Sequence, residues 1–177
     1  LVGYVIITLL VLGITLALVR IVSLSLTGSK VSAQKKSRAA NTDNPLGRIM
    51  QTYEQNSGMD VENLQLKLDD AILKELPNLE RGLSTIKVLA AISPMLGLLG
   101  TVTGMIETFQ AITLFGTGDP KMMAGGISQA LITTVLGLVA AIPLILLHSI
   151  ASGRSKAVIE VLEEQSAGII ASHAERA

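Results

Sequence analysis

Few side chains in this sequence could carry chemistry, and the types that are present exclude most catalytic and metal-binding sites. The 177 residues contain no cysteine, so there is no thiolate nucleophile and no cysteine-based metal site. The two histidines, His148 and His173, are too few and too far apart for an ordinary histidine metal cage. No nucleophile stands in a recognisable constellation with a base. We therefore predict that the chain is not an enzyme and binds no metal and no cofactor.

Hydroxyl and amide side chains recur inside the apolar stretches of the chain, together with one acid and one histidine. They are Thr101, Thr103, Glu107, Thr108, Gln110, Gln129, Thr133, Thr134 and His148. A single threonine in such a stretch usually bonds back to its own helix. Several threonines on two long stretches favour instead a mildly polar lining for an ion path or for a partner helix.

Glu107 is the only formally charged residue within an apolar stretch. An ionisable residue at that depth is a functional candidate by default, because burying a charge in a bilayer is costly. It also lies seven residues before Leu114, where the stretch ends, so a place near the outer membrane surface fits equally well. We expect Glu107 to be a local hydrogen-bond acceptor and not to carry a proton itself.

Three apolar blocks must position these side chains, at residues 2–19, 88–114 and 127–150. A bilayer core of about 30 Å needs roughly 20 apolar helical residues. Hydrophobic residues make up 49 % of the chain, and its mean hydropathy is +0.56. The 14 basic and 14 acidic residues give a net charge of zero, which excludes the basic footprint of a nucleic-acid binder. The fold class is therefore an all-α membrane protein with three transmembrane helices.

The basic residues set the predicted orientation. Five of them follow the first block before any acid occurs: Arg20, Lys30, Lys35, Lys36 and Arg38. Basic loops stay on the cytoplasmic side, so the N-terminus is expected outside and the Gly/Pro turn at 116–121 also outside. Because the chain starts with Leu1 and not Met, we expect these residues to come from within a longer precursor.

This orientation divides the chain into four parts. We predict a first transmembrane helix at 1–26, a cytoplasmic helical region at 27–87, the second and third transmembrane helices at 88–150, and a cytoplasmic C-terminal helix at 151–177. Within the cytoplasmic region, 28–44 has the composition of a linker. Pro77 suits an early turn of a new helix that runs on into the second span, so that the long helices extend into the cytoplasm.

Small residues on the second and third blocks predict close helix packing. Gly97, Gly100 and Gly104 form one stripe, and Gly137 lies on the third block. Helices in lipid associate through such surfaces, since hydrocarbon gives them no hydrophobic reason to meet. One short and two long spans make a poor self-contained bundle. We therefore expect a closed homo-oligomer that uses these surfaces between copies.

Two segments resemble the MotA/TolQ/ExbB proton-channel family, and ExbB most closely. Residues 93–106, SPMLGLLGTVTGMI, are similar to its second-helix signature, and residues 125–143, GGISQALITTVLGLVAAIP, to its third-helix signature. The resemblance implies a multi-pass subunit of a bacterial inner-membrane motor. Such subunits form a pentamer around an ExbD-like single-span protein, and proton flow through the unit energises a TonB-like protein for transport across the outer membrane.

The resemblance also assigns residues. Thr101 and Thr134 map onto the family's paired threonines, which line the ion path opposite an aspartate of the ExbD-like partner, and Thr133 lies beside them. Many relatives carry a glutamate where this chain has Gln129. An amide does not titrate, so Gln129 is expected to pack near the path without carrying protons, and sodium coupling stays open as an alternative to protons.

Two other functions remain open from the sequence. One is a TolQ-like subunit for envelope maintenance, and the other is a membrane scaffold that clamps a partner without conducting ions. The threonines on both long blocks favour a conducting subunit, because a scaffold would be served by leucine and glycine alone.

Overall fold

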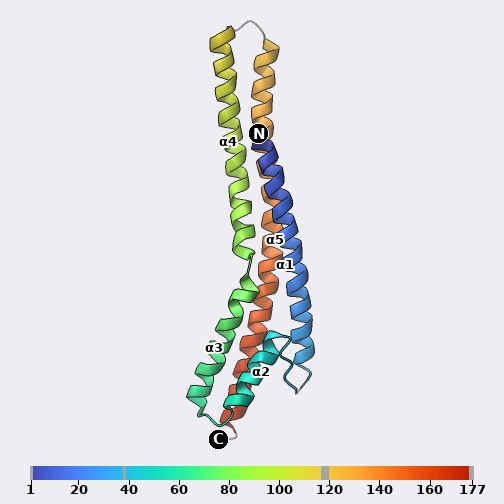
Figure 1. The fold of residues 1–177 in the computed structure, drawn as a ribbon, viewed down its shortest axis with the longest axis vertical. Coiled ribbons are helices and arrows are strands. Elements are labelled where there is room, and N and C mark those ends of the chain that lie inside the picture. The colour runs from blue at the N-terminus through green and yellow to red at the C-terminus, as the bar shows by residue number, and fades with distance from the viewer. Residues whose placement is uncertain (1, 38, 117–119, 176–177) are drawn as a thin grey trace. The chain divides into compact units, whose positions relative to one another are not determined.

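The computed structural model describes residues 2–37, 39–116 and 120–175, and within these ranges the chain is all-helical with no strand (Figure 1). This confirms the all-α fold class. The helices are α1 (Val2–Gln34), α2 (Pro45–Asn56), α3 (Val61–Glu80), α4 (Leu83–Phe115) and α5 (Pro120–Ala174).

Three helical segments in the described part of the chain are long and apolar enough to cross a membrane. They are Val2–Gln34, Val61–Leu114 and Met123–Ala174. The three predicted spans are thus confirmed as candidate membrane helices, while the orientation of the chain stays a prediction. By its contacts the chain divides into two compact units, the first formed by residues 1–18 and 82–149 and the second by residues 19–81 and 150–177.

The second unit has a conventional apolar core to which all four of its helical segments contribute. Its buried members are Leu24, Val31, Leu46, Ile49, Leu64, Leu68, Ile72, Leu79, Val158 and Leu162. The residues from α3 recur every three or four positions, which places them on one face of that helix. Burying each leucine or isoleucine contributes about 1.5–3 kcal/mol.

The segment between α1 and α2 is more ordered than its composition predicts. Helix α1 continues to Gln34, so the expectation that a linker begins at residue 28 is wrong for residues 28–34. The Gln34 side chain then donates to the carbonyl of Ala39 (2.8 Å) and accepts from the Asn44 amide (3.2 Å). Asn44 in turn accepts from the backbone N–H of Gly47 (2.8 Å) and caps the N-terminus of α2. Side-chain amides thereby satisfy the polar groups of this connection.

The break before the second span lies at Gly82, and not at Pro77 as expected. Pro77 lies inside α3. Because proline has no backbone N–H, the carbonyl of Leu73, four residues earlier, loses its helical hydrogen bond. Leu73 is on the exposed face of α3. The chain leaves α3 through an extended Arg81 and restarts at Gly82, whose φ of 80° is in the left-handed region that favours glycine. Helix α3 therefore ends at the turn formed by Arg81 and the left-handed Gly82, and Pro77 does not end it.

The third span and the C-terminal region form one continuous helix. Helix α5 runs for 55 residues from Pro120 to Ala174, so the predicted C-terminal helix at 151–177 continues the helix of the third span as far as Ala174. Pro143 lies inside α5, and Pro94 inside α4. Of the predicted outer turn at residues 116–121, residues 117–119 lie outside the described residues.

Candidate ion-path site

In the first unit, glycines allow the backbones of α4 and α5 to approach closely. A Cβ atom on Gly97 would lie 2.9 Å from the Thr133 carbonyl oxygen and 3.2 Å from the Cα of Gly137. A Cβ atom on Gly137 would lie 2.7 Å from the Ser93 carbonyl oxygen. Real Cβ atoms do not approach backbone atoms this closely, so neither glycine has room for a side chain. The two helices are in backbone contact at this level.

The same contact continues along α4. Gly100 faces the Thr133 side chain, and a Cβ atom on Gly104 would lie 2.8 Å from the Cβ of Ala130. Helix α5 of the same chain therefore covers the stripe formed by Gly97, Gly100 and Gly104. The expectation that this stripe is used between copies is wrong for this face, because the structure fills it within one chain.

Close approach of the backbones brings together the two threonines that the resemblance singles out. The hydroxyl groups of Thr101 on α4 and Thr134 on α5 form a hydrogen bond. Thr101 Oγ1 also lies 3.2 Å from the Gly97 carbonyl oxygen and 3.3 Å from that of Ala130. Thr134 Oγ1 lies 3.3 Å from the Gly97 carbonyl oxygen. Both side chains are half-buried.

Either hydroxyl can be the donor in the hydrogen bond between Thr101 and Thr134, so the direction of this bond can reverse. A hydroxyl has one proton to donate and two lone pairs to accept with. One proton lies between the two threonines, and the other can be donated to a backbone carbonyl of either helix. The pair can therefore respond to a nearby group that alternates between donor and acceptor without any movement of the backbone.

Thr133 joins the same cluster. Its hydroxyl donates to the Ala130 carbonyl (2.6 Å) and lies 3.4 Å from the Gly97 carbonyl oxygen. The Gly97 carbonyl is thus within hydrogen-bond reach of three threonine hydroxyls, on Thr101, Thr133 and Thr134. We call these three threonines with Gly97 the threonine cluster.

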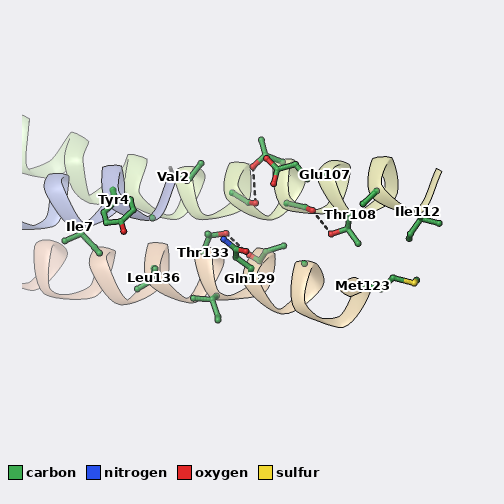
Figure 2. A pocket seen from close by; sticks show the side chains of 18 of the residues that line it. Val2, Tyr4, Ile7, Glu107, Thr108, Ile112, Met123, Gln129, Thr133 and Leu136 are labelled. Atoms are coloured by element: carbon green, nitrogen blue, oxygen red, sulfur yellow. Dashed lines mark hydrogen bonds between the residues drawn. The ribbon is translucent and has the colours of Figure 1, made fainter. Parts of the chain in front are cut away.

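A cavity of about 730 Å³ lies beside the threonine cluster, between α1, α4 and α5 within the first unit (Figure 2). Its polar lining comes from Thr103, Glu107, Thr108, Gln129 and Thr133. Glu107 and Gln129 therefore line one cavity, one from α4 and the other from α5, whereas Thr101 and Thr134 are not among its lining residues. Thr133 is the member of the threonine cluster that lines the cavity.

The polar wall of the cavity presents mainly acceptors. The Thr103 hydroxyl donates to the Leu99 carbonyl (3.0 Å) and the Thr108 hydroxyl to the Gly104 carbonyl (2.8 Å), which leaves oxygen lone pairs free to accept. No lysine or arginine is among the lining residues. Glu107 makes no ion pair with any residue that the structure describes. Among its lining residues the cavity therefore has one acidic side chain, Glu107, and no basic one.

One contact of this site, between Thr108 and Gly126, was not predicted from the sequence. The Thr108 hydroxyl occupies the space that a Cβ atom on Gly126 would need, so a larger residue at position 126 would force this hydroxyl to move. The Gly125–Gly126 pair at the start of the third block was the available signal, but a pair of glycines does not reveal which one is in contact. Gly125 has open space around it.

The described residues contain no group of three or more histidine, cysteine or acidic side chains that could hold a metal ion. What the unit offers is a set of hydroxyls and carbonyls between two apolar helices. Such an arrangement is typical of membrane transport components and is not a catalytic constellation.

Comparison with known proteins identifies the family. Residues 41–164 match the model of the MotA/TolQ/ExbB proton channel family, which is well over half of the 177 residues. The chain therefore belongs to this family. The match covers α2, α3, α4 and most of α5, so it includes the threonine cluster.

Individual relatives carry two different names. A biopolymer transport protein ExbB homolog of Methanothermobacter thermautotrophicus is 37 % identical over 120 residues, which is 68 % of this chain and 42 % of the relative. The biopolymer transport protein ExbB of Salmonella typhimurium is 34 % identical over 58 % of this chain and 41 % of its own length. The Tol-Pal system protein TolQ of Haemophilus influenzae is 36 % identical over 50 % of this chain and 39 % of its own length. The matched segments thus cover about two fifths of each of these relatives.

Proposed function

We propose that this chain is an ExbB-type subunit of a proton-driven motor in the bacterial inner membrane. It acts with an ExbD-like single-span protein and uses the proton motive force to energise a TonB-like protein for transport across the outer membrane. Membership of a proton channel family and similarity to proteins named ExbB support this proposal.

The observation that carries the proposal is the hydrogen bond between Thr101 and Thr134. It joins the two long apolar helices beside the contact between Gly97 and Gly137, where neither glycine has room for a side chain. A carboxyl group on a partner helix accepts a hydrogen bond when ionised and donates one when protonated. The reversible hydroxyl pair can serve both states, so it is suited to a partner carboxylate that loads and releases a proton.

The test removes the hydroxyls and keeps the shape. In the double variant Thr101→Val/Thr134→Val we expect whole-cell transport to fall to background while the amount of assembled complex stays normal. Valine is nearly isosteric with threonine, so a packing role alone would leave transport largely intact. Thr113→Val is the matched control, since its hydroxyl bonds only to the Phe109 carbonyl of its own helix (2.9 Å). Normal transport in the double variant would contradict the proposal.

A TolQ-like role is the second candidate, because a protein named TolQ is as similar to this chain as the ExbB proteins are. Both roles use the same threonine cluster, so variants in this chain do not separate them. Crosslinking in cells followed by mass spectrometry does, because it identifies the single-span partner. A partner with an intramembrane aspartate supports either motor, and a scaffold role would follow if the reconstituted assembly conducted no protons.

A further inference from the structure

Three arginines from three different elements gather at the C-terminal end of α3 in the second unit. Arg20 of α1 donates to the carbonyls of Asn78 and Leu79, each at 2.9 Å. Ser155 of α5 donates to the same Leu79 carbonyl (3.1 Å), and Arg154 precedes Ser155 in the sequence. Arg81 follows directly where α3 ends.

No carboxylate neutralises these arginines in the part of the chain that the structure describes. The ion pairs there involve Lys35, Arg48 and Lys74 only. Arg154 donates to the neutral Ser25 hydroxyl, and Arg81 is exposed and makes no hydrogen bond with a described residue. Glu80, the acid next to Arg81 in the sequence, is exposed and forms no ion pair.

The roles of the three groups differ. Arg20 is tied to two carbonyls, and its Nε is buried without a partner among the described residues, so it supplies positive charge and does not reach a ligand directly. Arg81 and Arg154 carry the guanidinium groups that can reach one. Guanidinium presents paired N–H donors in a fork that matches two oxygens of a phosphate. The chemistry of the cluster selects a phosphate anion.

The sequence indicates where that phosphate would be found. Arg20 follows Val19 at the end of the first apolar block, and Arg154 lies four residues after Ile150 at the end of the third. Arg81 lies seven residues before Val88, where the second block begins. All three arginines therefore flank apolar stretches at the same end, which is the level of phospholipid headgroups.

We propose that Arg81 and Arg154, with Arg20 behind them, form a binding site for the headgroup phosphate of an anionic phospholipid. The lipid would supply the ionic partner that no described carboxylate of the chain provides for these arginines. This site is distinct from the threonine cluster and does not depend on the proposed motor function.

The experiment measures lipid retention by the full protein in its native assembly. The assembly is reconstituted in bilayer discs with mixed phosphatidylglycerol and phosphatidylcholine, extracted in mild detergent, and the bound lipids are counted by native mass spectrometry. We expect wild type to retain phosphatidylglycerol selectively. Arg81→Gln and Arg154→Gln should each weaken retention about fivefold, whereas Arg81→Lys, which keeps the charge, should lose less.

Lys67→Gln is the matched control, because it removes one positive charge from an exposed position of α3 that lies 14 residues, or about 21 Å along the helix, before Arg81. A loss in Lys67→Gln equal to that in Arg81→Gln would overturn the proposal in favour of a general charge effect. Equal retention of both lipids by wild type, or unchanged retention in both glutamine variants, would overturn it too. Displacement of the lipid by millimolar inorganic phosphate would show a free-phosphate site and not a headgroup site.

Discussion

At the scale of single residues, the threonine cluster depends on two glycines, because glycine has no side chain and lets two backbones come into contact. Thr101 and Thr134 meet because Gly97 and Gly137 put two backbones in contact. A threonine hydroxyl in an apolar helix normally satisfies itself on its own preceding turn. Here the hydroxyls also reach across to the other helix, so the chemistry of the site and the packing of the helices share the same atoms.

Glu107 offers a sharp test at this scale. It lies six residues beyond Thr101, about 9 Å along α4, and lines the cavity with Gln129 and not with the hydroxyl pair. We expect Glu107→Gln to keep transport within about a factor of two of wild type, since the amide retains hydrogen bonding and loses only titration. Proton flux into liposomes that contain the assembly is the measurement. Abolished flux with intact assembly would show that Glu107 handles protons and that our assignment is wrong.

Two glycines on α5 should change the stability of the chain in opposite directions when each is replaced by alanine. Gly137 is packed against Ser93 and Gly97, whereas Gly153 has open space around its Cα. Gly137→Ala should therefore destabilise the chain by roughly 1–3 kcal/mol through steric overlap. Gly153→Ala should stabilise it by about 0.5–1 kcal/mol through helix propensity. Thermal unfolding in detergent, followed by circular dichroism, measures both. Equal effects from the two would mean that the α4–α5 contact is looser than described.

At the scale of elements, the second unit relies on a few polar contacts besides its apolar core. Arg48 of α2 forms two parallel hydrogen bonds with Glu75 of α3, each 2.7 Å long, and a third to the Thr42 carbonyl. Glu75 is buried, so its charge needs this partner. The side-chain hydrogen bond to Glu75 is the main cause that raises the pKa of Arg48.

Breaking this ion pair should have a measurable cost. Arg48→Gln leaves the buried Glu75 carboxylate without its bidentate partner, and we expect a loss of about 1–3 kcal/mol in the free energy of unfolding. The pKa of Arg48 is raised from an ordinary value that already lies far above neutral pH. This contribution to stability is therefore fully present below the ordinary value and is lost only as the pH rises through the folded value, so the effect should be constant from pH 6 to 9. Denaturant unfolding at several pH values measures it. Lys74→Gln, which breaks the exposed pair with Asp70, is the control and should cost under about 0.5 kcal/mol.

The N-terminus of α3 should respond to acid. Asp60 caps this helix, and hydrogen bonds first from the Asn63 side chain and then from its backbone N–H lower the pKa of the carboxyl below 3.8. A lowered pKa contributes stability above the unfolded value, which is lost as the pH falls through the folded value. We therefore expect the protection factor of the Asn63 amide, its intrinsic exchange rate divided by the observed rate, to fall below about pH 3.8, the unfolded value. In Asp60→Asn, which caps without titrating, this dependence should disappear. Its persistence would place the responsible group elsewhere.

The sequence predicted the apolar elements well and their connections poorly. Apolar length alone identifies the three spans, because a bilayer requires it. Local propensity favours a break both at Pro77 and at the polar residues 28–34, and the helix continues through both. The hydrogen bonds between Gln34 and Asn44, and from Arg20 to the Leu79 carbonyl, join residues that no local pattern connects. Similarly, the glycine stripe predicted a close contact but not that the partner is α5 of the same chain.

At the scale of the whole molecule, α5 covers the glycine stripe of α4, so contacts between copies are predicted on other faces of these helices. On α4, large apolar side chains such as Leu98, Val102 and Ile106 are at least half exposed in the single chain. They are free to face lipid or a neighbouring copy. We still predict a closed homo-oligomer, with a pentamer as the expected size.

Native mass spectrometry in mild detergent checks this prediction, and we expect a mass five times that of one subunit, with any partner chain in addition. Substitution of Val102 by a glutamate on the exposed face should disrupt assembly if that face lies between copies, because a charge there would be desolvated. A stable monomer in wild type would contradict the oligomer.

The contact between Gly97 and Gly137 also limits how this protein can evolve. A side chain at either position forces the helices apart, and the Thr101–Thr134 hydrogen bond is lost with the contact. A compensating change elsewhere would have to restore the spacing of two backbones, which no single substitution achieves. Selection on the hydroxyl pair and selection on the fold therefore act on the same few positions. Descendants of this sequence can diversify the exposed residues of their helices while the contact between α4 and α5 stays nearly fixed.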